Sequence, residues 1–438
     1  MDQTEDQFNQ QLCAFLDASP TPFHAVSSMV AMLADAGFSE LSDEQNWSLK
    51  AGGKYYVVRN GSSIVAFVAG SELISTAGVR IAGAHTDSPC PMLKPQPEME
   101  KGGFSQLGVE IYGGALLNPW FDRDLSIAGR VVYKDAQQEL KQTLVNFKQP
   151  VATIPSLAIH LDCNANKERT INPQTDIPPI LKLNLSNQKA QSFREILQQQ
   201  FLTKQDQVLD FELCLYDTQP AALIGLEQEL LASGRLDNLL SCFVAIQALI
   251  KADGSQTCIV ACNDHEEVGS VSAVGADGPF LESVIAKIAA NESSSLDISA
   301  VMDKSLLISC DNAHAVHPNY MDKHDAGHLP SINGGPVIKT NVKQRYATNS
   351  VTSSRFKQLC EQVDVPVQQF VSRADMGCGS TIGPISSSRL GVATIDVGIP
   401  QLAMHSCREL AGSKDPLRLA VVLDAFFNSD QAMDCDWV

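Results

Sequence analysis

Basic residues are scarce in this chain of 438 residues, where 32 lysines and arginines stand against 50 aspartates and glutamates. The formal net charge of −18 repels phosphate groups, so neither a nucleic acid nor an anionic membrane is an expected partner. No stretch approaches the roughly 20 apolar residues that cross a bilayer. The first six residues carry three acidic side chains and no basic one, unlike a secretory signal. We therefore expect a cytoplasmic protein.

Paired cysteines and nucleotide-binding motifs are missing as well. None of the 12 cysteines forms a C-x-x-C pair, which argues against a zinc knuckle or a thioredoxin-type site. Most are expected to be buried thiols in apolar surroundings, among them Cys214, Cys242, Cys258 and Cys262. Neither G-x-x-x-x-G-K-[ST] nor a helix-opening G-x-G-x-x-G follows a predicted strand. The sequence therefore disfavours nucleotide-binding and redox enzymes.

Helical and strand patterns alternate over most of the chain. Thr21 and Pro22 are typical of a helix start, and Asn60-Gly61 is typical of a hairpin turn. The predicted helices cover residues 6–17, 22–36, 237–250, 279–290, 350–363 and 415–427. The predicted strands cover residues 54–60, 63–69, 79–84, 257–262, 306–310, 367–372 and 392–397. Short apolar strands between helices favour an α/β fold whose sheet is covered on both faces.

Residues 93–225 have a different pattern, with many glutamines and proline-rich turns. Strands are predicted there over 107–112, 126–133 and 209–216, and one helix over 190–202. We therefore expect an α/β domain, made of residues 1–92 and 226–438, that is interrupted by a β-rich insert.

Polar clusters follow the predicted strands or precede helices, at the sheet edge where α/β proteins bind ligands. Each has an ordinary explanation by itself, such as a helix cap, a turn residue or a solvated carboxylate. The side chains concerned are His85, Asp87, Asp237, Glu266, Glu267, Asp311 and His405.

Together these side chains match the needs of two divalent ions about 3.5–4 Å apart, which require a bridging carboxylate and further histidine and carboxylate ligands. A separate carboxylate must then act as general base. The adjacent Glu266 and Glu267 can divide these roles between them. Asp87 lies two residues after His85, on the same face of an extended segment, and could orient its ring.

Six ordered blocks resemble the M18 metallopeptidases, the aspartyl aminopeptidase family, and most of all its bacterial aminopeptidases. They are A-H-T-D-S-P-C (84–90), S-G-R-L-D-N (233–238), D-H-E-E-V-G-S (264–270), Q-R-Y-A-T-N (344–349), G-S-T-I-G-P-I (379–385) and M-H-S (404–406). The resemblance implies a zinc-peptidase-like α/β domain with a central mixed sheet and a dimerisation insert.

The resemblance also implies a role for each polar residue. Asp237 would bridge two zinc ions, with Mn²⁺ or Co²⁺ as possible substitutes. His85 and Asp311 would complete one ion's ligands, and Glu267 and His405 the other's. Glu266 would be the general base, and Asp87 the partner that orients His85.

Substrates implied by the resemblance are peptides with a free N-terminal Asp or Glu. Lys339, in G-P-V-I-K (335–339), would bind the acidic side chain, and Tyr346 would line the pocket. The alternative for Lys339 is a solvated lysine at a strand end. His160 would reach the active site of a neighbouring subunit and contact the substrate; otherwise it is an interface histidine on an apolar strand.

Family members typically assemble from dimers into tetrahedral dodecamers, so a homo-oligomer is expected here. Two other functions stay open on the sequence alone. One is a related di-zinc aminopeptidase or amidohydrolase with a broader or neutral preference. The other is a non-enzymatic scaffold, which the intact ligand set disfavours.

Overall fold

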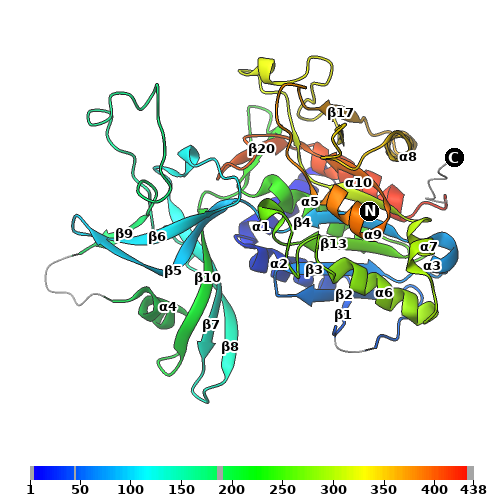
Figure 1. Cartoon of the computed structure of the whole chain (residues 1–438), viewed down its shortest axis with the longest axis horizontal. Helices are drawn as coiled ribbons and strands as arrows, with labels where there is room; N and C mark the ends of the chain where they lie inside the picture. Colours follow the sequence, from blue (N-terminus) through cyan, green and yellow to red (C-terminus); the bar gives the residue numbers. More distant parts are fainter. Residues whose placement is uncertain (1–3, 44–45, 185–190, 432–438) are drawn as a thin grey trace. The chain divides into compact units, whose positions relative to one another are not determined.

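The computed structural model describes residues 4–43, 46–184 and 191–431, which form two compact units (Figure 1). The first unit takes Met1–Asp87, Ala221–Met404 and Glu409–Val438, and the second takes Ser88–Pro220 and His405–Arg408. Within the described ranges, no helix has both the length and the apolar character that crossing a membrane requires.

A mixed sheet forms the centre of the first unit, with nine described strands in the order β1-β2-β3-β13-β4-β14-β18-β16-β17. Strand β4 lies between β13 and β14 and is parallel to both, whereas β3 and β16 are antiparallel to their inner neighbours. The predicted α/β class with a central mixed sheet is confirmed. The strands are β1 Ser39–Glu40, β2 Lys54–Arg59, β3 Ser63–Val68, β4 Arg80–His85, β13 Cys258–Asn263, β14 Leu306–Cys310, β16 Val337–Thr340, β17 Gln368–Val371 and β18 Ala393–Gly398.

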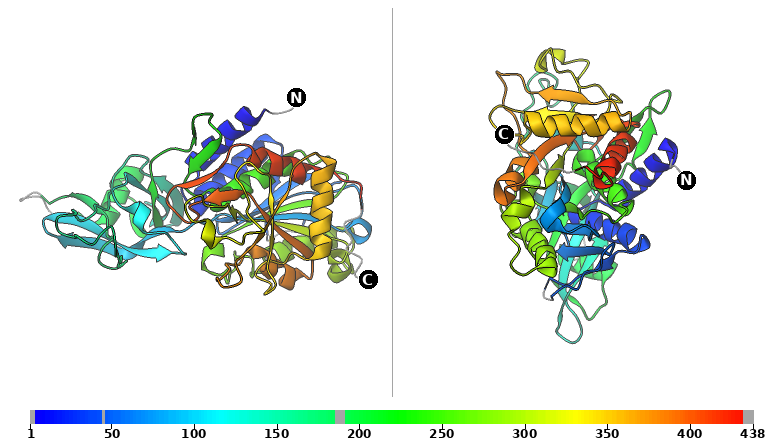
Figure 2. Two further views of the ribbon diagram at one scale, coloured as in Figure 1. Left: turned by 90° about the horizontal axis from the view of Figure 1, so that it is seen from above. Right: turned by 90° about the vertical axis from the view of Figure 1, so that its right-hand side faces the viewer.

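Helices cover both faces of this sheet (Figures 1 and 2). On one face, α1, α2, α5, α8 and α10 share a core with Ala82 and Ala84 of β4; on the other, α3, α6 and α7 pack with Ile81. Both faces of β4 are buried, which explains why its interior, residues 81–84, has no polar side chain. The helices are α1 Glu5–Ala18, α2 Pro22–Asp35, α3 Ile74–Ala77, α5 Leu236–Ile250, α6 Phe280–Glu292, α7 Ile298–Met302, α8 Ser350–Gln362, α9 Ile382–Leu390 and α10 Asp415–Phe427.

A second, smaller sheet of the same unit has the order β11-β12-β20-β19-β15. Its strands have only two to four residues each, too few for a periodic pattern, and the sequence did not indicate them. They are β11 Ala222–Ile224, β12 Leu230–Ser233, β15 Ala313–His314, β19 Pro400–Leu402 and β20 Glu409–Gly412. Short 3₁₀ turns, η2 Glu266–Val268 and η3 Met321–Lys323, also belong to this unit.

The second unit is built on an antiparallel sheet with the described order β8-β7-β10-β5-β6-β9. Helix α4 packs on it through Phe193 and Leu197. The helix predicted over 190–202 is α4, although residue 190 lies outside the described residues. The elements are β5 Cys90–Lys101, β6 Phe104–Tyr112, η1 Asn118–Trp120, β7 Leu125–Lys134, β8 Leu140–Asn146, β9 Ile180–Leu183, α4 Phe193–Phe201 and β10 Gln207–Asp217.

The start of α2 follows the predicted capping pattern. Thr21 is the N-cap, Pro22 is the first helical residue, and the Thr21 hydroxyl lies 2.8 Å from His24 Nδ1. Burial, together with the charge of Arg235, lowers the pKa of His24 to about 4. His24 therefore stays neutral in the folded chain under conditions where it would be charged in the unfolded chain.

This shift makes stability depend on pH. The folded pKa is depressed, so the contribution of His24 is present above about 6.5 and is lost as the pH falls toward about 4. We expect the unfolding temperature of His24→Asn, whose amide oxygen can replace Nδ1 as acceptor, to fall less than that of the wild type over this range. Thermal unfolding of both proteins at pH 4.5 and 7 measures this, and parallel changes would contradict it.

Candidate metal centre

His85 ends the central strand β4 and is buried. Its Nδ1–H donates to the main-chain carbonyl of Asp87 at 3.1 Å, which leaves Nε2 to face the neighbouring carboxylates. Nε2 lies 3.4 Å from Asp237 Oδ1. The ring is therefore fixed in the orientation that a metal-binding histidine needs.

Asp237 is presented at the beginning of α5. Arg235 adopts a left-handed conformation, and Asp237 and Asn238 are not yet helical, so the regular helix begins after them. The Asp237 N–H donates to Glu409 Oε2 at 2.9 Å, and Asn238 Nδ2 donates to the carbonyl of Cys310 at 2.8 Å. These two bonds fix the backbone that carries the carboxylate.

The two adjacent glutamates lie in η2, directly after β13, and His265 makes the turn with a φ of 65°. The N–H groups of Glu266 and Glu267 donate to Asp87 Oδ1 and Oδ2, at 3.2 and 3.0 Å. Asp87 Oδ1 also lies 3.4 Å from His85 Nδ1. The Asp87 carboxylate therefore supports the glutamate turn as well as the imidazole, a contact that the sequence did not indicate.

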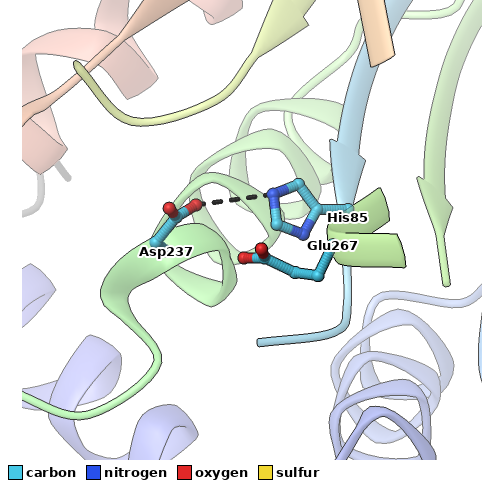
Figure 3. Close-up of side chains that lie close together, drawn as sticks. All are labelled: His85, Asp237 and Glu267. Carbon is cyan, nitrogen blue, oxygen red and sulfur yellow. Dashed lines mark ion pairs between the residues drawn. The ribbon is translucent and has the colours of Figure 1, made fainter. Parts of the chain in front are cut away.

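Three of these side chains converge, as Figure 3 shows. One ligand atom each from His85, Asp237 and Glu267 lie within 4.8 Å of one another. An imidazole nitrogen with two carboxylates is a donor set that zinc accepts, and three protein ligands are usual at a catalytic zinc. The residues therefore fit a zinc ion.

Asp311 borders this group from the end of β14. Its Oδ1 lies 3.8 Å from His85 Nε2, and its Oδ2 lies 3.3 Å from Lys339 Nζ. Glu266 Oε2 is 4.0 Å from the same imidazole nitrogen. Four carboxylates therefore surround His85 at short range: Asp237, Glu266, Asp311 and Asp87.

This crowding changes the pKa values of the site. Burial, reinforced by Asp311, Glu267 and Asp87, raises the pKa of Glu266 to about 8. Burial alone would lower the pKa of His85, but hydrogen bonds to Asp237, Asp311 and Asp87 raise it well above its usual range. Both shifts reflect negative charge gathered in a buried place, which favours the binding of cations.

Lys339 lies next to Asp311 in the first unit, and Tyr346 lies next to Lys339. Lys339 is buried, and its ammonium donates to the carbonyl of Asn312 at 3.2 Å. The ammonium lies 5.1 Å from the ring centroid of Tyr346. The alternative interpretation of Lys339 as a solvated lysine is therefore wrong.

His405 and His160 belong to the second unit. His405 Nδ1–H donates to the carbonyl of Gly114 at 3.1 Å, and the Leu116 N–H donates to the carbonyl of His405 at 2.9 Å. His160 is exposed and lies in a turn, not on the expected apolar strand. Its neighbours Ile159 and Leu161 are exposed too, so this segment has no buried face to make it a strand.

Glu409 is a further residue beside the site, and no motif in the sequence predicts it. It is buried at the start of β20 and accepts the hydrogen bond from Asp237. A charged residue leading a short apolar stretch is the only signal in the sequence, and it is not specific.

Comparisons with known proteins agree over nearly the whole chain. Residues 15–427 match the model of the family described as aminopeptidase I zinc metalloprotease (M18). A probable M18 family aminopeptidase 2 from Stutzerimonas stutzeri is 54% identical over 428 residues, 97% of this chain and 99% of the relative. One from Azotobacter vinelandii is 54% identical over 427 residues, 97% of this chain and 98% of the relative.

Solved structures are similar as well. Ape4 in its complex with Nbr1 has a TM-score of 0.93 at 39% identity, with 97% of this chain and 86% of that chain covered. The mApe1 dodecamer of S. cerevisiae has a TM-score of 0.84 at 30% identity, with 97% and 96% covered.

Proposed function

Because this chain belongs to the M18 family of zinc metalloproteases and is an aminopeptidase, we propose that it uses two zinc ions to remove N-terminal Asp or Glu from peptides. The observation that carries the proposal is the convergence of His85, Asp237 and Glu267 within 4.8 Å, with Asp311 and Glu266 beside them. We assign catalysis to residues 1–92 and 226–438, and subunit pairing to the insert of residues 93–225.

Five side chains hold the two ions in this proposal. Asp237 would be shared by both ions, His85 and Asp311 would hold one, and Glu267 and His405 would hold the other. His85 and His405 each donate Nδ1–H to a main-chain carbonyl, which leaves Nε2 as the ligand atom in both. Nitrogen and oxygen donors of this kind also accept Mn²⁺ or Co²⁺.

Zinc bound here supplies Lewis acidity and lowers the pKa of a bound water toward neutrality. Glu266 takes a proton from the attacking water and passes it to the leaving amine nitrogen, as a general base and then a general acid. Its Oε2 is 4.0 Å from His85 Nε2, so Glu266 lies near the proposed metal ligands although it is not one of them. Asp87 keeps Glu266 and Glu267 in their different roles by holding both of their N–H groups.

The acidic preference rests on Lys339. An acidic substrate side chain in a buried pocket needs a cation as its partner. Lys339 is a buried cation beside the proposed metal ligand Asp311, and the ring of Tyr346 would line the same pocket. One observation favours a broader or neutral preference as the second candidate. Lys339 is already paired with Asp311 at 3.3 Å, so part of its charge is balanced before a substrate arrives.

We extend the proposal to the assembly. A homo-oligomer built from dimers, with the tetrahedral dodecamer as its full form, is supported by the similarity to the mApe1 dodecamer. His160 would then contact substrate in a neighbouring subunit, a role consistent with its exposed position among Leu157, Ile159 and Leu161. The cytoplasmic location stays a prediction.

A substrate panel tests this function. We expect the purified protein to cleave N-terminal Asp and Glu anilides at least about tenfold more efficiently than Leu or Lys anilides. The reason is that a charge buried in the pocket without a partner costs more free energy than a tenfold difference in rate represents. Chelation should abolish all cleavage, and added Zn²⁺, Mn²⁺ or Co²⁺ should restore it. Cleavage that resists chelation would contradict the metal mechanism. A preference for Leu would contradict the acidic pocket and favour the second candidate.

A further inference from the structure

Apart from Tyr346, the residues of two sequence blocks have no role in the chemistry described so far. Residues 344–349 connect β16 to α8, and residues 379–385 lead into α9. Their polar groups meet at a single buried side chain, Asp396, in the interior of β18.

Asp396 bonds both segments at once. Its Oδ2 accepts the Ala347 N–H at 2.7 Å, and its Oδ1 accepts the Thr381 hydroxyl at 2.6 Å. Its own main-chain N–H donates to Thr348 Oγ1 at 2.9 Å. One residue of the central sheet therefore fixes the connection after β16 and the beginning of α9.

The close approach of α9 depends on a glycine. A Cβ added at Gly383 would lie 2.3 Å from both carboxylate oxygens of Asp396. Any side chain there would push the helix start off the carboxylate and separate Thr381 from it. The glycine of the block G-S-T-I-G-P-I thus has a physical reason, which is room for Asp396.

Lys339 lies on the strand next to Asp396. The antiparallel register pairs Val337 with Gly398 and Ile338 with Val397, and its continuation sets Lys339 opposite Asp396. Side chains directly opposite on neighbouring strands project to the same face. Tyr346, whose ring lies 5.1 Å from the Lys339 ammonium, immediately precedes the Ala347 amide that Asp396 holds.

We propose that Asp396 is a positioning residue that holds Tyr346 against Lys339 and so fixes where the ammonium points. It acts through the 344–349 connection and through α9, without touching the substrate. The inference rests on the proposed role of Lys339 as the cation that binds an acidic N-terminal side chain. It explains both blocks by one shared anchor.

Two substitutions remove this anchor to different degrees. Asp396→Ala removes both carboxylate acceptors, and Thr348→Val removes the two bonds between the Thr348 hydroxyl and the Asp396 main chain with little change of shape. Thr394→Val is the matched control, because Thr394 is a buried threonine of the same strand whose hydroxyl bonds only the carbonyl of Val392 in the hydrogen bonds described. Asp396→Asn is the conservative variant, since an amide can accept from Ala347 and donate to Thr381.

We expect Asp396→Ala and Thr348→Val to raise KM for an N-terminal Glu substrate by about tenfold, because small displacements of a positioned group have effects of this size. Their kcat, zinc content and KM for an N-terminal Leu substrate should stay within about threefold of wild type. Amide hydrogen exchange in residues 344–349 should become faster in both. Asp396→Asn and Thr394→Val should behave as wild type in every measurement.

The outcomes separate this inference from the proposed function. If the wild type cleaves Glu and Leu substrates equally, the acidic preference fails and this inference fails with it. If the wild type prefers Glu but KM is unchanged in Asp396→Ala and Thr348→Val, the inference alone is overturned. An effect of Asp396→Asn as large as that of Asp396→Ala would also overturn it, because charge and not position would then be the cause. Should Asp396→Ala not fold, Thr348→Val decides.

Discussion

Replacing Glu266 by glutamine is expected to leave the zinc content unchanged and to lower kcat by about 10²–10⁴-fold, the usual contribution of a general base. Glutamine has nearly the same shape but cannot take up a proton. Its main-chain N–H would still bond Asp87, so the turn that presents Glu267 would be kept. Steady-state kinetics on a Glu anilide, with zinc measured on the same sample, test this expectation.

Glu267→Gln provides the contrast. Glu267 belongs to the group of converging ligand atoms, whereas Glu266 does not, so only Glu267→Gln should lose zinc. Near-normal turnover of Glu266→Gln would exclude it as the base. Zinc loss in Glu266→Gln equal to that in Glu267→Gln would make it a ligand instead.

Lys339→Ala is expected to lower kcat/KM for acidic N-terminal residues by about 10²-fold or more, the range found when one partner of a buried charge pair is removed. The loss on a Leu substrate should be smaller, below about tenfold, because it reflects only the unpaired Asp311. In the wild type the Lys339 ammonium lies 3.3 Å from Asp311 Oδ2. Removing it leaves Asp311 without this partner, so activity on every substrate should fall to some degree. Parallel assays with Glu and Leu anilides measure the difference.

Lys343→Ala is the matched control, because Lys343 is an exposed lysine four residues further along the same segment. It should leave both substrates unaffected. Equal losses on Glu and Leu substrates in Lys339→Ala would limit Lys339 to supporting Asp311, and the acidic preference would need another source.

Local signals predicted much of the first unit. The helices α1, α2, α6, α8 and α10 and the strands around them follow apolar periodicity, and caps such as Thr21 mark their ends. These signals work because each element buries one face or both in a continuous core. The fold class follows from the alternation of such elements along the chain.

Strand β5, Cys90–Lys101, shows where such signals fail. Pro91, Pro95 and Pro97 argue against a strand because proline cannot donate to the ladder. In the structure the register with β6 shifts between Leu93 and Glu98, so Pro95 and Pro97 fall in the irregular stretch. Helix α9 is hard to predict for a similar reason. Gly383 and Pro384 are poor helix formers, and in the structure they lie in its first turn.

The polar clusters themselves were predictable because they follow strand ends, and His85, Asp237 and Glu267 do converge. Their supports were not. The hydrogen bond between Glu409 and Asp237 joins residues 172 positions apart in the sequence, and the one between Asp396 and Ala347 joins residues 49 positions apart. Contacts of this range depend on the tertiary fold, and a single acidic residue inside a strand gives no local sign of them.

His405–Arg408 and Ser88–Pro220 belong to one compact unit, although they lie far apart in the sequence. The acceptor that fixes the His405 ring, the Gly114 carbonyl, lies 291 positions earlier and inside the insert. In the proposed site His405 would bind a metal ion, so its orientation would depend on a carbonyl of the insert unit. A chimaera that replaces residues 88–220 would therefore have to keep Gly114, or another acceptor in its place, for that imidazole.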